Sequence, residues 1–362
     1  IPNQDHYTQL LIKEIRQKAQ HTPQQTVTSV YFGGGTPSLM TPAQLGSVLA
    51  ELKNHFVFKS GLEITIEINP GTLTQKLVDD FLAIGVSRFS VGAQTFDDHL
   101  LVRLGRKHSS KETAETLDLL NKNKINFSLD LLFALPQQSF PQLQKDLDNL
   151  ISFSPPHVST YYLNVPEHHF LSVARPTDEV QVEMFHTIES HLEKNGIYRY
   201  EISNFAKSGF ESQHNLVYWT QNPYWGIGLG AHSYQAPSLE YPFGLRFSNP
   251  RSFSGYERHL ERLDNRNFLE LLPKENIEKL EKHQAMTEFC YTSLRRTRTG
   301  FSLQEFSENF SMVPKVLEQE LANLIKRGLL TTEGPRYILS KEGRILSNLV
   351  FERLTFLKED LY

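Results

Sequence analysis

Cysteine is almost absent from this sequence: Cys290 is the only one among 362 residues. A single thiol excludes a disulfide framework within the chain. It also excludes an iron–sulfur cluster or a thiolate zinc site built from these residues alone, since such sites need about three or four thiolates. Cys290 lies between aromatic residues in a helical pattern, so we expect it to be a small core side chain.

Long apolar runs and a strong net charge are lacking too. No run approaches the roughly 18 apolar residues that a transmembrane helix needs, and no leader peptide pattern opens the sequence. A net charge of −4 argues against a nucleic-acid partner held by bulk charge. With 39% hydrophobic and 22% charged residues, the composition is typical of a globular protein, and we expect a cytoplasmic one.

Strand-like apolar runs alternate with amphipathic helices over residues 1–205. Helix start signals separate the runs: Thr41 supplies an N-cap oxygen before a proline, and Ser109 with Glu112 has the spacing of a capping box. Such alternation predicts a parallel sheet, wound as an α/β barrel or part of one. The expected strands are Val27–Phe32, Leu62–Ile68, Arg88–Val91, Asn126–Phe133, His157–Leu163 and Tyr198–Ile202.

The pattern changes after residue 205, which suggests three parts. Residues 206–265 are rich in aromatic residues, glycine and asparagine without a clear period, and a segment of this length favours a role in lining a site. Residues 266–362 are largely helical, and a helix beginning at Ser302, a second helix and a hairpin predict a winged-helix-like domain. We therefore expect a barrel of residues 1–205, an extension of residues 206–265 and a C-terminal domain of residues 266–362.

Polar residues gather where the expected strands end. In parallel barrels, catalytic and binding groups occupy the carboxyl ends of the strands. The run Gly33–Gly35 exposes backbone amides to a ligand, and the carboxylates of Glu67 and Asp130 accept hydrogen bonds from hydroxyls or an amine. Taken singly, each has an ordinary interpretation: a tight turn for the glycines, and a cap or salt bridge for the carboxylates. Their co-occurrence at strand ends favours a binding site.

As a set, these residues resemble the motifs of the HemN/HemW branch of radical S-adenosylmethionine (SAM) proteins. The segment Tyr31–Ser38 resembles the glycine motif, and further blocks follow in the family's order: Glu67–Pro70, Val91–Phe96, Leu104–Arg106 and Leu129–Pro136. The resemblance covers nearly the whole chain. It implies an α/β fold with a partial (β/α)6 radical SAM barrel and a mostly helical C-terminal domain, with SAM and a [4Fe-4S] cluster as cofactors.

By position, the resemblance implies a SAM site at the strand ends. Its residues are Gly34, Gly35, Thr36, Glu67, Gln94, Arg106 and Asp130. In the family, a CxxxCxxC loop after the first barrel strand holds the cluster. This sequence shows neither the loop nor that strand, so we expect the cluster cysteines upstream of Ile1 and assign no metal ligand within the chain. Without that segment, we expect no reductive cleavage of SAM.

The segment His214-Asn215-Leu216-Val217-Tyr218-Trp219 resembles the HNxxYW signature of the haem-chaperone branch of this family. The resemblance implies a protein that binds haem and transfers it to acceptor haem proteins. Histidine is a ligand of haem iron, and tyrosine and tryptophan stack on a porphyrin face, so we expect His214, Tyr218 and Trp219 to bind haem. Without the resemblance, His214 reads as a hydrogen-bonded structural histidine, and His232 as a polar loop residue.

Two alternative functions stay open at this point. One is that of the related oxygen-independent coproporphyrinogen III oxidases, which perform a radical oxidative decarboxylation in porphyrin biosynthesis. The other is a glycosidase with Glu67 and Asp130 as its acid and base, although this explains neither the glycine motif nor the segment 214–219. The sequence leaves open the haem acceptor, the axial ligand, a second SAM molecule and the oligomeric state, a homodimer included.

Overall fold

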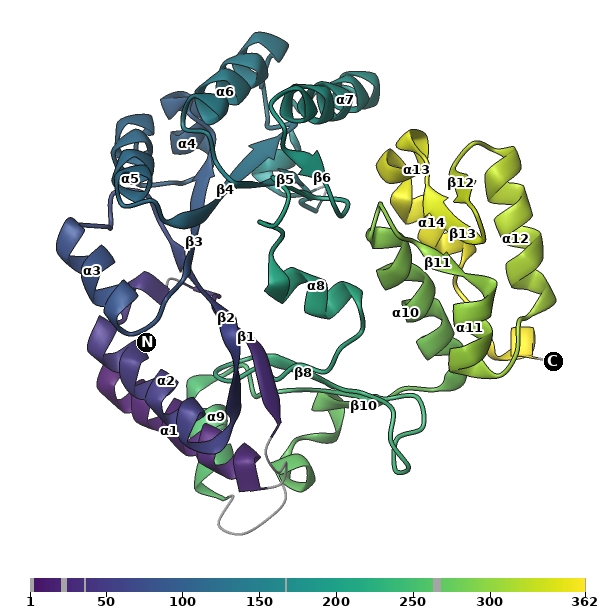
Figure 1. Cartoon of the computed structure of the whole chain (residues 1–362), viewed down its shortest axis with the longest axis horizontal. Coiled ribbons are helices and arrows are strands. Elements are labelled where there is room, and N and C mark those ends of the chain that lie inside the picture. Colours follow the sequence, from purple (N-terminus) through teal and green to yellow (C-terminus); the bar gives the residue numbers. More distant parts are fainter. Residues whose placement is uncertain (1–2, 21–24, 36, 167, 263–267, 362) are drawn as a thin grey trace. The chain divides into compact units, whose positions relative to one another are not determined.

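The computed structural model describes residues 3–20, 25–35, 37–166, 168–262 and 268–361 (Figure 1). The chain forms two compact units, each built from separated segments. Unit 1 combines Ile1–Thr28, Ala43–Gly61 and His214–Tyr362, and unit 2 combines Ser29–Pro42 and Leu62–Gln213. In the part of the chain that the structure describes, no helix has both the length and the apolarity for a membrane crossing.

Unit 2 is built around a seven-stranded sheet. The first residues of its strands β1 and β2 belong to unit 1. The strand order is β1-β2-β3-β4-β5-β7-β6. Strands β2 to β5 pair in parallel, as predicted, whereas β7 runs antiparallel to both β5 and β6. The strands are β1 (Thr26–Phe32), β2 (Val57–Ile68), β3 (Arg88–Gln94), β4 (Asn126–Phe133), β5 (His157–Tyr162), β6 (Tyr198–Arg199) and β7 (Asn204–Ala206).

Amphipathic helices connect the parallel strands and cover them with apolar faces. Capping boxes form at Ser109 and Ser139, so these two helices begin where the sequence predicts. Phe89 and Phe127 on adjacent strands are buried at 0% and 1% exposure, and they belong to the core beneath the helices. The helices are α3 (Gln75–Ala83), α4 (Asp98–Arg103), α5 (Ser110–Lys122), α6 (Phe140–Ser152) and α7 (Asp178–Lys194), with the short 3-10 turns Pro37–Leu39 and Phe170–Ser172.

The last predicted strand, Tyr198–Ile202, differs most from expectation. It is reduced to β6, and the chain turns through residues 200–203 into β7, which the sequence did not predict. So short a connection joins only antiparallel strands, because parallel neighbours need a long crossover. Arg199 is 4% exposed and pairs with Glu189 of α7 at 3.0 Å, which fixes this edge of the sheet onto α7.

Unit 1 contains the N-terminal helices, a small sheet and the C-terminal helices. Its second sheet has the order β10-β9-β8. These elements are α1 (Gln4–Gln20), α2 (Pro42–His55), α8 (Gln213–Trp219), β8 (His232–Gln235), β9 (Leu245–Ser248), α9 (Phe253–Glu261) and β10 (Ile277–Lys279), with the 3-10 turns Phe268–Leu271 and Lys274–Asn276. Leu245, Tyr256 and Leu260 form the centre of its core with Leu10 of α1.

The C-terminal part has the predicted helix, helix and hairpin, with a further strand paired to the hairpin. A capping box starts the first helix at Ser302, and Cys290 is a buried core residue as expected. The strand order is β11-β13-β12. The elements are α10 (Lys282–Arg295), β11 (Phe301–Ser302), α11 (Leu303–Phe310), α12 (Lys315–Lys326), β12 (Leu330–Glu333), β13 (Arg336–Leu339), α13 (Lys341–Ile345), α14 (Ser347–Arg353) and the 3-10 turn Lys358–Leu361.

A buried ion pair on α1 holds the glycine-rich segment 226–230. Lys18 Nζ lies 2.7 Å from the Glu14 carboxylate, one helical turn away, and both side chains are at most 3% exposed. Glu14 accepts from Gly228 N at 2.8 Å, while Lys18 donates to Gly226 O at 2.8 Å. Each charge therefore binds one backbone group of the same segment, so that α1 fixes its path.

Further groups complete the shell of this ion pair. Asn249 Nδ2 donates to Glu14 at 2.7 Å, and the Tyr256 hydroxyl donates to the same carboxylate. Lys18 Nζ also lies 4.4 Å from the centre of the Phe268 ring. Burial lowers the pKa of Lys18, and the charge of Glu14 opposes that shift. Burying two charges is costly, and only such a set of partners compensates for it.

Candidate functional site

Glu67, at the end of β2, binds the glycine loop that follows β1. Its carboxylate accepts from the Tyr31 hydroxyl at 2.8 Å and from Gly34 N at 3.1 Å. Gly34 and Gly35 have φ of 77° and 67°, a region that strongly favours glycine. A Cβ on Gly33 would lie 2.9 Å from Glu67 Oε1, so this glycine is required for the close approach. Thr36 lies outside the described residues.

Asp130 of β4 has an unsatisfied acceptor. Its Oδ1 is buried and has no hydrogen-bond partner within the described ranges, although buried polar atoms in proteins are nearly always paired. Burial raises the pKa of Asp130 to about 6; the Ser159 hydroxyl opposes this, and the charge of Glu67 adds to it. A ligand hydroxyl or amine would supply the missing donor. This orphaned oxygen is the observation that best fits a nucleoside or amino-acid ligand at the strand ends.

Gln94 and Arg106 complete the predicted SAM set. Gln94 ends β3 with φ of 69°, rare for a residue with a side chain, and it is 6% exposed. The strand register shifts between Val91 and Gln94, which redirects the chain at this end of the sheet. The charge of Arg106 lowers the pKa of Asp130, so the guanidinium acts on the same cluster. Gly34 is hydrogen-bonded to Glu67, and the charges of Glu67 and Arg106 both act on Asp130. The structure thus brings these four residues together.

Two residues of this cluster were missed from the sequence. Tyr31 donates to Glu67, and Arg88, only 2% exposed, pairs with Glu63 at 3.3 Å. The charge of Arg88 also lowers the pKa of Asp130. Tyr31 looked like an ordinary strand aromatic, but it precedes the glycine run by two residues and so shares a strand face with Gly33. For Arg88, the signal was a charged residue at the start of an apolar strand.

The predicted haem-binding residues share one short helix, α8. His214 and Tyr218 are four residues apart and therefore lie on one face; the His214 Nε2 atom is 3.1 Å from the Tyr218 hydroxyl, and their rings meet edge to face with centroids 5.2 Å apart. Burial lowers the pKa of His214 to about 4, so its imidazole is neutral at pH 7. A neutral imidazole is the form that binds iron.

An aromatic row continues from Tyr218. The Tyr218 and Tyr224 ring centroids are 4.5 Å apart in an edge-to-face contact, and Tyr234 follows at 6.3 Å from Tyr224. Burial raises the pKa of Tyr218 to about 12, so its hydroxyl stays protonated. The ring centroid of Trp219 lies 6.4 Å from that of Tyr218. His232, by contrast, is an exposed residue at the start of β8.

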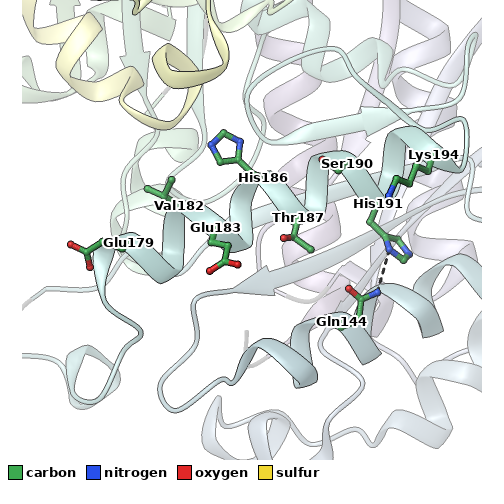
Figure 2. A pocket seen from close by; sticks show the side chains of 9 residues that line it. All are labelled: Gln144, Glu179, Val182, Glu183, His186, Thr187, Ser190, His191 and Lys194. Atoms are coloured by element: carbon green, nitrogen blue, oxygen red, sulfur yellow. Dashed lines mark hydrogen bonds between the residues drawn. The ribbon is translucent and has the colours of Figure 1, made fainter.

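A pocket of about 470 Å³ lies along the outward face of α7 (Figure 2). Its lining residues recur at helical spacing along α7, with Gln144 of α6 opposite His191 at 3.4 Å. Glu179, Val182 and Glu183 are exposed, and none of the lining residues belongs to a strand end. We therefore assign no ligand to it. Over the described residues, no group of three or more histidine, cysteine or acidic side chains is placed to hold a metal ion.

Comparisons with known proteins identify relatives of this chain. Residues 2–150 match the Radical SAM superfamily, whose chemistry uses SAM and a [4Fe-4S] cluster. The chain is 31% identical over 369 residues to "Heme chaperone HemW" of Lactococcus lactis, covering 99% of this chain and 90% of that protein. It is 30% identical over 361 residues to the protein of the same name in Bacillus subtilis, covering 96% and 90%.

The fold has a counterpart among solved structures. Coproporphyrinogen III oxidase (HemN) from Escherichia coli superposes with a TM-score of 0.79, covering 97% of this chain and 83% of that one. At 17% sequence identity, this likeness concerns the fold alone. It confirms the predicted α/β architecture, a partial radical SAM barrel with a mostly helical C-terminal domain.

Proposed function

We propose a haem-chaperone function on one premise: this chain belongs to the HemW family of radical SAM proteins. In this proposal the protein binds haem and passes it to acceptor haem proteins. The observation that carries it is helix α8, which combines a neutral imidazole at His214 with the aromatic rings of Tyr218 and Trp219. Iron ligation and ring stacking are the two interactions that hold a haem.

His214 is the proposed axial ligand. Because its pKa is about 4, no proton has to be removed before the imidazole binds iron at neutral pH. The contact with the Tyr218 hydroxyl occupies Nε2 of His214. Iron therefore competes with the Tyr218 hydroxyl if it binds Nε2, and we expect Tyr218 to be released towards the porphyrin when haem enters.

SAM is the proposed ligand of the strand ends in unit 2. Bound SAM supplies a sulfonium and an adenosyl group there. Gly34 and Gly35 offer backbone amides, Glu67 accepts from the methionyl amine, and Asp130 offers its unpaired oxygen to a ligand donor. We include Thr36, Gln94 and Arg106 in this set, as the family resemblance implies. The cluster ligands are not among these residues, since Cys290 is the sole cysteine and is buried.

Haem titration tests the function. We expect the purified chain to give a saturable Soret band with ferric haem, and His214→Ala to weaken binding at least about tenfold with loss of the low-spin histidine spectrum. His232→Ala is the matched control and should behave like the parent chain, because His232 is exposed and outside α8. Absence of a saturable Soret band in the parent chain would refute the haem-chaperone proposal.

A further inference from the structure

The chain leaves β3 through a strained turn centred on Gln94. Thr95 N donates to Ala93 O at 2.9 Å, and Gln94 between them has φ of 69°. A hydrogen bond that spans three residues, with a positive φ at the central one, is a γ-turn of the rare and strained kind. Such a backbone persists only where the surrounding groups fix it. Because Gln94 belongs to the proposed SAM set, whatever fixes this turn also places a ligand-binding side chain.

The turn directs the Gln94 side chain back over the end of β3. A Cβ on Gly92 would lie 3.0 Å from Gln94 Nε2 and 3.9 Å from Asn69 Oδ1. The Gln94 amide and the residue that follows β2 therefore approach the same point above Gly92. Glu67, which binds the glycine loop, comes only two residues before Asn69. The amide thus lies among the strand ends that carry the proposed ligand contacts.

Asp146 of α6 holds the segment that follows the turn. Its two carboxylate oxygens accept from Thr95 Oγ1 at 2.8 Å and from Phe96 N at 2.7 Å. Asp146 and Thr95 are buried, at 1% and 0% exposure, so water does not compete for these bonds. The Thr95 hydroxyl also accepts from Asp97 N at 3.1 Å. One carboxylate therefore fixes, directly or through Thr95, the three residues that come after Gln94.

Helix α6 makes two further contacts with the same segment. Gln142, one helical turn before Asp146, donates from Nε2 to Asp97 Oδ2 at 2.9 Å. Phe153, the C-cap of α6, stacks on Phe96 with ring centroids 6.0 Å apart. Gln142 and Phe153 contact side chains of the segment, whereas Asp146 also holds its backbone through Phe96 N. The carboxylate therefore acts most directly on the path of the chain after the turn.

From this geometry we propose that Asp146 is a positioning residue of the SAM site: by binding Thr95 and Phe96, it holds the strained turn that places the Gln94 amide at the strand ends. The inference rests on the SAM site proposed above. Asp146 lies on a helix that covers the sheet, and both of its carboxylate oxygens are occupied within the protein. It therefore acts through Gln94 and not by touching the ligand. Without the carboxylate, we expect the turn to relax and the amide to leave its place over Gly92.

The test is a double-mutant cycle, with the affinity for labelled SAM measured by equilibrium dialysis at pH 7.5. We expect Gln94→Ala and Asp146→Ala each to weaken SAM binding by about tenfold. In the Gln94→Ala background, Asp146→Ala should weaken binding by less than about twofold, because no amide remains to be positioned. Asp146→Asn should retain part of the affinity, since its amide oxygen still accepts from Phe96 N and its NH2 group donates to Thr95 Oγ1.

Two further variants of α6 are the controls. Asp148→Ala removes an exposed carboxylate and should leave the SAM affinity unchanged. Leu147→Ala, at a position with 0% exposure, should lower the free energy of unfolding but removes no hydrogen bond to the segment, so the SAM affinity should be kept. Hydrogen exchange gives a readout that needs no ligand: residues 95–97 should exchange faster in Asp146→Ala than in Leu147→Ala.

The outcomes separate the inference from the site on which it rests. If Asp146→Ala weakens SAM binding equally in the parent and Gln94→Ala backgrounds, or if Leu147→Ala weakens it as much, the positioning role is wrong while the SAM site stands. The same holds if Gln94→Ala binds SAM as the parent chain does. If the parent chain does not bind SAM, both proposals fail. Urea denaturation checks that each variant is folded. If Asp146→Ala is not, Asp146→Asn takes its place in the cycle, with a smaller expected factor.

Discussion

Asp130 shows at the scale of one residue how burial sets up a ligand contact. Its Oδ1 has no partner among the residues described, and its pKa of about 6 places the loss of its charge just below neutrality. A carboxyl group in this position accepts hydrogen bonds above that pH and loses acceptor capacity below it. The chemistry of the strand ends should therefore depend on pH through this side chain.

We predict that SAM binding weakens as the pH falls through about 6 and that Asp130→Asn removes this dependence. The sign follows from protonation: below its pKa Asp130 is a neutral acid, and an acceptor for a ligand amine or hydroxyl is lost. At pH 7.5, Asp130→Asn should weaken binding by about tenfold, the usual loss of a charged hydrogen bond. Equilibrium dialysis with labelled SAM measures both effects.

The control for this prediction is Asp118→Asn, an exposed carboxylate on the neighbouring helix α5. It should keep the parent affinity and the parent pH dependence. An affinity of the parent chain that stays constant from pH 5 to 7.5 would contradict the role given to Asp130.

Among single residues, the sequence predicted site residues where a glycine or a charged side chain interrupts an apolar strand pattern. Glycines, Glu67 and Asp130 at strand ends are anomalous in an apolar pattern, and the structure shows that Glu67 and Gly34 are in contact. Tyr31 is an ordinary aromatic residue by pattern, and Trp219 was singled out only through the HNxxYW resemblance. Their partners, Glu67 and Arg295, are distant in sequence, and periodicity carries no information about such contacts.

At the scale of elements, α1 stabilises unit 1 through Glu14 and Lys18. The pair is buried and holds both Gly226 and Gly228, so removing one charge leaves the other buried without its counter-ion. A buried unpaired charge is among the most destabilising changes in a protein. Nothing in the amphipathic pattern of α1 predicted this, because a glutamate and a lysine four residues apart usually form an exposed pair.

We predict that Lys18→Met lowers the free energy of unfolding by about 3–5 kcal/mol. The double variant Glu14→Gln, Lys18→Met should recover part of that loss, because no isolated charge remains. Urea denaturation of the three proteins measures the coupling. Arg16→Met is the matched control on the same helix. Arg16 is 61% exposed and pairs at 2.8 Å with Glu51, so water and salt reach the guanidinium and weaken the attraction. The Glu51 carboxylate, although largely buried, keeps its contact with His55 when Arg16 is removed.

Equal destabilisation by Lys18→Met and Arg16→Met would contradict the account of the buried pair.

The sequence predicted the starts of helices where capping residues were present, as at Ser109, Ser139 and Ser302. The prediction of one continuous strand at Tyr198–Ile202 was wrong, because the ion pair of Arg199 and a tight turn determine the structure there.

For the whole molecule, the order of the parallel strands followed from the sequence, whereas the grouping of segments did not. The division into residues 1–205, 206–265 and 266–362 stays a prediction. The compact units of the structure group Ile1–Thr28 and Ala43–Gly61 with His214–Tyr362. The Glu14 contacts with Gly228, Asn249 and Tyr256 show why, since they connect the first helix to segments more than two hundred residues later.

We predict that the winged-helix-like C-terminal part does not make this protein bind DNA. The net charge is −4, and α12 carries two lysines and two glutamates rather than a basic stripe. Affinity for duplex DNA depends on neutralising phosphates with lysine and arginine. At about 150 mM salt, fluorescence anisotropy should show no binding of a labelled duplex up to about 10 µM protein. A salt-dependent rise in anisotropy would contradict this.

The seven-stranded sheet has two unlike edges. β6 offers two residues at one edge, and within the described residues β1 offers seven at the other. Unpaired N–H and C=O groups on a long edge strand attract a further strand, whereas a very short edge gives it little to pair with. Among the described residues, β1 is therefore the edge to which a further strand adds, whether that strand is the first barrel strand expected from the family resemblance, a peptide or a misfolded copy in a concentrated solution. Aggregation screens of this protein should begin with substitutions along Thr26–Phe32.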